Sequence, residues 1–197
     1  MISNDLSLFL IFISACIVNN ILLIRFIALC PFFGLANQLE ASVGIGMAVI
    51  FVMVISSSVT WIFYYYLLEP FNILFLRTAV FILVIATLVQ LEEMYIRKML
   101  PALYKSLGIY LPLITTNCAI LAAAFLGIDY KLSFVQNLVY SLGVSSGFTL
   151  SIVLFATIME RIKAAPIPKY FQGYPIAFIT ASLMSLAFLG FSRLFGL

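Results

Sequence analysis

Charged residues are sparse along this chain, and they divide it into long uncharged stretches. Residues 41–68 and residues 132–159 each form a run of 28 without a charge, and residues 170–192 form a run of 23. An α-helix needs about 20 apolar residues to cross the hydrocarbon core of a bilayer. Each run therefore predicts a membrane-spanning helix, and the two longer runs allow some tilt.

Three further apolar stretches bring the number of predicted spans to six. One extends from about Phe71 to Leu91, with Arg77 near its start. The other two, Leu6–Gly34 and Ser106–Ile128, contain proline, glycine and asparagine, which are typical of helices broken inside a membrane. We therefore predict an all-α integral membrane protein with six transmembrane helices, of which the first and the fourth are broken.

Each broken stretch carries a proline near a cysteine. In Ala28–Gly34 (ALCPFFG), Pro31 lacks an N–H group and disfavours helical geometry at Cys30. In Leu111–Cys118 (LPLITTNC), a proline precedes three polar side chains and the cysteine. Unpaired backbone groups in hydrocarbon are costly unless protein, water or a cofactor satisfies them. Both breaks are therefore expected to lie where protein, water or a cofactor satisfies their backbone groups.

The order of broken, long and short span occurs twice, in residues 1–100 and 101–197 of a single membrane domain. The cysteines of the two breaks, Cys30 and Cys118, are 88 residues apart, and the two 28-residue runs are 91 apart. Because each unit has an odd number of spans, the second unit must lie upside down relative to the first. Inverted repeats place their functional site near the midplane, where the broken helices of the two halves meet.

The basic residues near the ends of the spans predict the orientation, because cytoplasmic loops carry an excess of lysine and arginine. Seven basic residues fall in the loops after the first, third and fifth spans: Arg25, Arg97, Lys98, Lys105, Arg161, Lys163 and Lys169. Only three fall on the other side: Arg77, Lys131 and Arg193. Both termini are therefore expected on the non-cytoplasmic side of the membrane.

The composition narrows the chemistry that the chain can perform. Apolar residues make up 65% of it, charged residues 9%, and the mean hydropathy is +1.23, so almost nothing remains for a domain outside the bilayer. The absence of histidine removes imidazole as a metal ligand and general base. The net charge of +3 comes without a basic run, and nucleic acid is not an expected partner.

The two cysteines at the breaks allow three interpretations. They are small buried apolar residues, or they form a disulfide, or their thiolates bind zinc, copper(I) or an iron–sulfur cluster. Cys30 and Cys118 provide only two ligands, so a four-cysteine cluster would need two more from a homologous partner. Cys16 is expected to be an ordinary apolar residue, because nothing near it signals a break.

Other polar residues are weaker candidates for function. Glu92 and Glu93 lie at the predicted cytoplasmic end of the third span. They could simply form a solvated helix end, or they could contact a transported ion as it enters. Asn19, Asn20 and Asn117 could supply oxygen ligands to that ion, but capping of the broken helices is the favoured role.

A glycine pair in the fifth span has a simpler interpretation. Gly143 and Gly147 are four residues apart, and this spacing is typical of close helix packing in membranes.

The residues also carry a resemblance to a known family. The strings Val18–Asn20 (VNN), Leu29–Gly34 (LCPFFG), Leu111–Ala119 (LPLITTNCA) and Phe178–Phe188 (FITASLMSLAF) resemble the A subunits of Rnf electron-transport complexes. The similarity extends over essentially the whole chain. Relatives of these proteins are the E subunits of Rnf complexes, together with the D and E subunits of the sodium-pumping NADH:quinone oxidoreductase.

The resemblance implies a function that the composition does not. Rnf complexes transfer electrons between ferredoxin and NAD⁺ and transport Na⁺ or H⁺, so the chain would be one subunit of an oxidoreductase, without catalysis of its own. With the homologous E subunit it would share a midplane [2Fe–2S] cluster, with Cys30 and Cys118 as half of the ligands. Flavins and further iron–sulfur clusters would belong to other Rnf subunits.

Two functions of other classes stay open beside this one. An inverted-repeat secondary ion carrier would use the broken helices to bind the ion directly. A structural scaffold would hold redox partners without a redox centre. The carrier is disfavoured because the second, fourth, fifth and sixth predicted spans contain no carboxylate.

Overall fold

The computed structural model of the chain consists of helices and connecting turns in the part that it describes. That part comprises residues 2–34, 39–69, 74–99, 117–166 and 168–194. The α-helices are α1 (Ile2–Ile13), α2 (Leu29–Gly34), α3 (Leu39–Phe63), α5 (Arg77–Met99), α8 (Cys118–Asp129), α9 (Phe134–Lys163) and α10 (Tyr174–Leu194). Two π-helical turns, Ser14–Val18 and Tyr64–Leu68, extend α1 and α3, and two short 3₁₀ turns precede α5 and α10: Leu74–Leu76 and Lys169–Phe171.

Three helices are long and apolar enough to cross a membrane, and they coincide with three of the predicted spans. They cover Ala41–Leu68, Arg77–Tyr95 and Phe134–Lys163. The stretches predicted as the first, fourth and sixth spans contain shorter apolar helices in the described residues: Ser7–Val18, Cys118–Asp129 and Tyr174–Gly190. The all-helical class is thus confirmed for the described residues. Residues 106–116 of the predicted fourth span lie outside the described residues.

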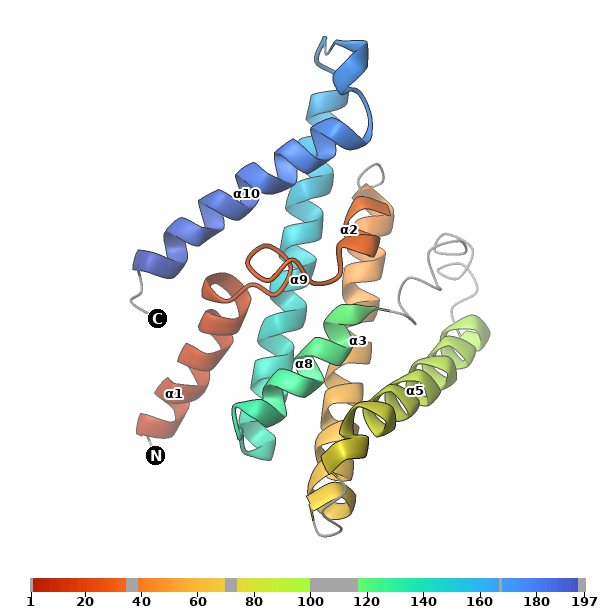
Figure 1. The fold of residues 1–197 in the computed structure, drawn as a ribbon, viewed down its shortest axis with the longest axis vertical. Helices are drawn as coiled ribbons and strands as arrows, with labels where there is room; N and C mark the ends of the chain where they lie inside the picture. The colour runs from red at the N-terminus through yellow and green to blue at the C-terminus, as the bar shows by residue number, and fades with distance from the viewer. Residues whose placement is uncertain (1, 35–38, 70–73, 100–116, 167, 195–197) are drawn as a thin grey trace.

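An antiparallel pair of long helices, α3 and α9, forms the centre of the molecule (Figure 1). Their contact surface consists of fully buried side chains such as Ile45 and Met53 from α3 and Phe148 and Ile152 from α9. The remaining helices surround this pair, and α5 packs beside α3 and α8 with one end directed away from the rest (Figure 1). The pair therefore provides the frame on which the shorter helices are placed.

Glycines let α1 approach α9 closely. A Cβ atom at Gly147 would lie 2.5 Å from the backbone oxygen of Cys16, and one at Gly143 would lie 2.9 Å from the backbone oxygen of Phe12. Such contacts would clash, so only glycine allows this spacing at either position. The packing role predicted for the two glycines is confirmed.

Candidate cysteine site at two helix starts

The chain leaves helical geometry between α1 and α2, in residues 19–28, which is earlier than predicted. Phe26 and Ala28 adopt positive φ angles of 53° and 67°, which side chains other than glycine rarely do. The expectation that Pro31 breaks the helix is wrong. Pro31 lies in the first turn of α2, where backbone N–H groups have no helical partner and its missing N–H costs nothing.

Asn20 holds the break in place from a fully buried position. Its Oδ1 accepts hydrogen bonds from the N–H groups of Leu22 (3.1 Å) and Leu23 (3.3 Å). Its Nδ2 donates to the carbonyl of Gly147 (2.9 Å) and to Oγ of Ser151 (2.8 Å), both in α9. The favoured capping role is therefore confirmed for Asn20, and its hydrogen bonds extend across the molecule to α9.

Two other residues lie in or beside this break. Cys16 lies in a half-buried π-helical turn, and its carbonyl accepts a hydrogen bond from Nδ2 of Asn20 (3.1 Å); its role as an ordinary apolar residue stays a prediction. Arg25, counted above with the loop after the first span, lies between α1 and α2, and its Nη2 donates to the hydroxyl of Tyr130 (2.9 Å) at the end of α8.

The second cysteine begins a helix of its own. Cys118 is the first residue of α8, and Oδ1 of Asn117 caps this helix by accepting the N–H of Ala119 (3.0 Å). The capping role favoured for Asn117 is thus confirmed as well. Its Nδ2 is buried without a hydrogen-bond partner among the described residues. The proline of the predicted second break, Pro112, lies outside the described residues.

The two cysteine-bearing helices begin near the middle of the molecule's long axis and run toward opposite ends (Figure 1). Each is followed by one of the long antiparallel helices, α3 after α2 and α9 after α8. Cys30 and Cys118 both stand in the first turn of their helix, and both side chains are exposed on the surface of this chain. The interpretation of these two residues as apolar side chains buried within this chain therefore does not fit the structure.

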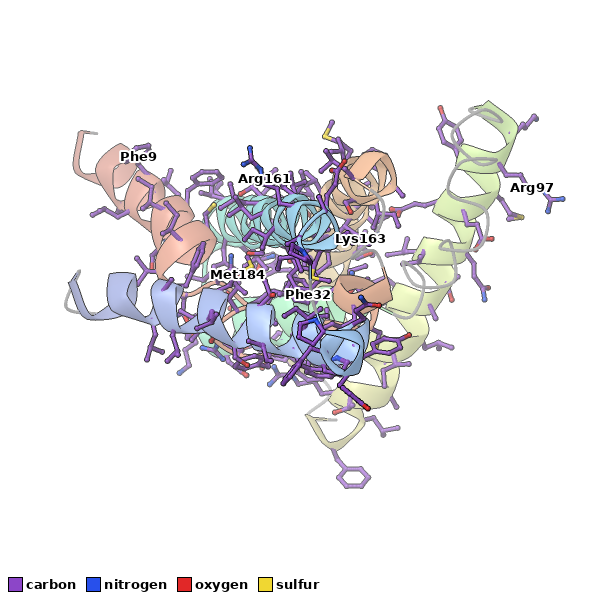
Figure 2. The ribbon with its side chains drawn as sticks, turned by 90° about the horizontal axis from the view of Figure 1, so that it is seen from above. Phe9, Phe32, Arg97, Arg161, Lys163 and Met184 are labelled. Carbon is purple, nitrogen blue, oxygen red and sulfur yellow. The ribbon has the colours of Figure 1, made fainter. Side chains whose placement is uncertain are left out.

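Aromatic contacts fix α2 while leaving its cysteine exposed. The fully buried ring of Phe32, labelled in Figure 2, stacks on Phe155 of α9 with 4.0 Å between centroids. Phe33 packs 4.4 Å from Phe178 of α10 and 5.9 Å from Phe155. One side of this short helix is anchored to two longer helices, and Cys30 remains exposed on the other.

Sequence reasoning missed the residue that joins α5 to α8. The guanidinium of Arg77 pairs with Asp129 (2.8 Å), and its centre lies 4.7, 5.6 and 5.7 Å from the ring centroids of Phe125, Phe81 and Tyr64. These contacts combine an ion pair with cation–π attraction. The sequence gives no local signal for them, because Arg77 and Asp129 are 52 residues apart.

Glu92 differs from an ordinary solvated helix end. Both of its carboxylate oxygens are buried and lack a hydrogen-bond partner among the described residues, and Glu93 beside it is half-buried. An unpaired carboxylate within a membrane helix is a typical candidate for an ion contact. That role remains a prediction for both residues.

Comparison with known proteins decides the family. The family model described as "Rnf-Nqr subunit, membrane protein" matches residues 8–195, nearly the whole chain. The chain belongs to the Rnf–Nqr family. Both cysteines, both breaks and all seven α-helices that the structure describes fall at least partly within the Rnf–Nqr match.

Among members of the Rnf–Nqr family, several curated relatives cover the same length. The A subunit of the ion-translocating oxidoreductase complex of Syntrophotalea carbinolica is 54% identical, over 95% of this chain and 97% of the relative. The A subunit of the Na⁺-translocating ferredoxin:NAD⁺ oxidoreductase complex of Acetobacterium woodii is 50% identical over 95% and 97%. The corresponding protein of Aeromonas salmonicida is 49% identical over 94% and 96%. The resemblance to Rnf A subunits is thereby confirmed.

The described residues do not form a complete metal site. No group of three or more cysteine, aspartate or glutamate side chains gathers among them. Cys30 and Cys118 can supply two thiolates, which is half of a four-cysteine set. Any four-cysteine cluster held by this Rnf–Nqr protein would therefore take its other ligands from elsewhere.

Proposed function

We propose that this chain is the A subunit of an ion-translocating ferredoxin:NAD⁺ oxidoreductase and that Cys30 and Cys118 hold one side of an intramembrane [2Fe–2S] cluster. The homologous E subunit would supply the other two cysteines. Support for the complex comes from the relatives, which are similar over nearly their whole length and carry the name of its A subunit. Support for the two ligands comes from the positions of the cysteines.

One observation carries the assignment of the ligands. Both cysteines are exposed in the first turn of helices that begin near mid-height and run in opposite directions (Figure 1). A thiol that only fills space in a membrane protein is normally buried. Two exposed thiols at corresponding helix starts suit a shared site on the surface where a partner docks.

The surroundings of these cysteines fit an anionic iron–thiolate group. Thiolate is the ligand that iron–sulfur clusters prefer. The positive end of the α8 dipole lies at Cys118, and Asn117 adds an amide N–H that has no partner among the described residues. When bound, such a cluster would accept and pass on one electron at a time.

The chain's own residues would position the two thiols. Asn20 ties the break before α2 to α9, and Phe32 stacks α2 on the same helix. On the other side, Asn117 starts α8, and Arg77 holds the far end of α8 to α5. Fixed helix starts keep the sulfur atoms in place, which limits the rearrangement that accompanies electron transfer.

The proposal includes six spans in two inverted three-helix units. Its support is that corresponding helices of the two halves run in opposite directions: α2 runs opposite to α8, and α3 runs opposite to α9 (Figure 1). With Arg25 assigned to the break, six basic residues remain on the predicted cytoplasmic side against three on the other. For a protein of the bacterial cytoplasmic (inner) membrane, as the resemblance to Rnf subunits implies, the positive-inside rule therefore still favours both termini on the non-cytoplasmic side.

Serine substitutions of the three cysteines test the ligand assignment in the assembled complex. Cys30→Ser and Cys118→Ser should each abolish or strongly alter the paramagnetic signal and visible absorption of the shared cluster, because serine replaces a thiolate ligand. Cys16→Ser is the matched control, since Cys16 is half-buried in the π-helical turn, and it should leave both signals unchanged. An unaltered signal in either of the first two variants would refute the assignment.

A further inference from the structure

A cavity of about 460 Å³ lies where α2 and α9 end and α10 begins. Phe33 and Gly34 of α2 form one side, and Met159 and Ile162 of α9 form another. The start of α10 closes the third side. The cavity therefore touches the same short helix that carries Cys30, at the opposite end of that helix.

The lining is amphipathic and carries one positive charge. Apolar side chains make most of the wall, and the ammonium of Lys163, the last residue of α9, is the charged group among the described lining residues. No carboxylate lies among them, and Lys163 forms no ion pair within the described part of the chain. The site thus offers an uncompensated cation beside an apolar space.

The position of the cavity along the bundle matches the membrane surface. Lys163 ends a 30-residue helix that is long enough to cross the bilayer. Tyr170 and Tyr174 follow this helix, with 93% and 72% of their surface exposed. Tyrosine is enriched at the level of the lipid headgroups. Arg97 and Lys98 occupy the last turn of α5, at the predicted cytoplasmic side. Anionic lipids give the cytoplasmic leaflet a negative surface potential that attracts basic residues.

We propose that this cavity binds an anionic phospholipid, with its phosphate at Lys163 and part of an acyl chain against the apolar wall. A free phosphate ion would use the lysine but leave most of the lining without a contact. A zwitterionic lipid would place its own cation beside the ammonium of Lys163. Because Phe33 and Gly34 form part of the wall, a bound lipid would also support the C-terminal end of α2.

Lipid retention by the purified complex that contains this chain tests the proposal. The complex is reconstituted in phosphatidylcholine alone or with phosphatidylglycerol, and the lipids that stay bound are counted by native mass spectrometry. Lys163→Gln should weaken phosphatidylglycerol binding about fivefold, the loss expected for one basic residue, and Lys163→Arg should restore it. Arg161→Gln is the control, because Arg161 is exposed in the same turn but lies on the side of α9 away from α10 (Figure 2). It should leave binding unchanged.

A second variant tests the apolar half of the site. Ile176→Phe narrows the cavity without changing its charge and should displace the lipid. The Lys163→Gln variant should keep the fold intact, because Lys163 is exposed. Four results would overturn the proposal: equal losses in Lys163→Gln and Arg161→Gln, equal retention of the two lipids, competition by inorganic phosphate, or a cavity filled by a neighbouring protein of the complex and therefore free of lipid.

Discussion

At the scale of single residues, asparagine side chains stabilise the interrupted helices of this membrane protein. Asn20 satisfies two backbone N–H groups of the break and binds two acceptors in α9. Asn117 does the simpler task of capping α8. The capping of both was predictable from the sequence, because asparagine bonds readily to nearby backbone. The long-range contacts of Asn20 were not, since Gly147 and Ser151 are 127 and 131 residues away.

Substitution of Asn20 should be far more damaging than substitution of its neighbour. Asn20→Ala leaves the N–H groups of Leu22 and Leu23 buried without partners, at about 1–3 kcal/mol each. We expect a marked fall in the apparent unfolding temperature of the purified complex in detergent. Asn19→Ala is the control, because Asn19 is exposed and its N–H bond to Ser14 involves only the backbone. Equal losses in the two variants would contradict the role of Asn20.

At the scale of helices, the sequence predicted the long elements well and the short ones less well. The three long spans were predictable because length and hydropathy alone determine them. The start of α2 was not, because Pro31 fits either a helix break or a first helical turn, and local sequence does not distinguish the two. Tertiary packing decides between a break and a helical turn, because Phe32 and Phe33 pack on α9 and α10 only if this segment is helical.

Close packing of α1 on α9 should depend on glycine at position 147. Gly147→Leu would force a side chain into the backbone of Cys16 and should separate the two helices, with loss of the Asn20 hydrogen bond to the carbonyl of residue 147. Reduced assembly of the complex, measured by size-exclusion chromatography, is the expected result. Gly190→Leu in α10 is the matched control, because a Cβ atom at Gly190 meets nothing within 4 Å. Normal assembly of the Gly147 variant would show that this contact is dispensable.

At the scale of the whole molecule, the candidate site lies at the surface of this chain. The cysteines were predictable as a pair from their matching places in the two breaks, and the family resemblance supplied the cluster. Their exposure was not predictable, because a hydrophobic sequence does not reveal which face of a bundle a partner covers. Under the proposed function, the exposed Cys30 and Cys118 would form one half of the site, and a partner would supply the other half.

The iron content of this chain purified together with its proposed partner, a homologous E subunit, tests the central claim most directly. A [2Fe–2S] cluster shared by two cysteines from each protein predicts about two iron atoms per pair, and little iron in either protein purified by itself. An ion carrier or a scaffold needs none. A correctly assembled pair without iron, or full iron content in this chain by itself, would contradict the account.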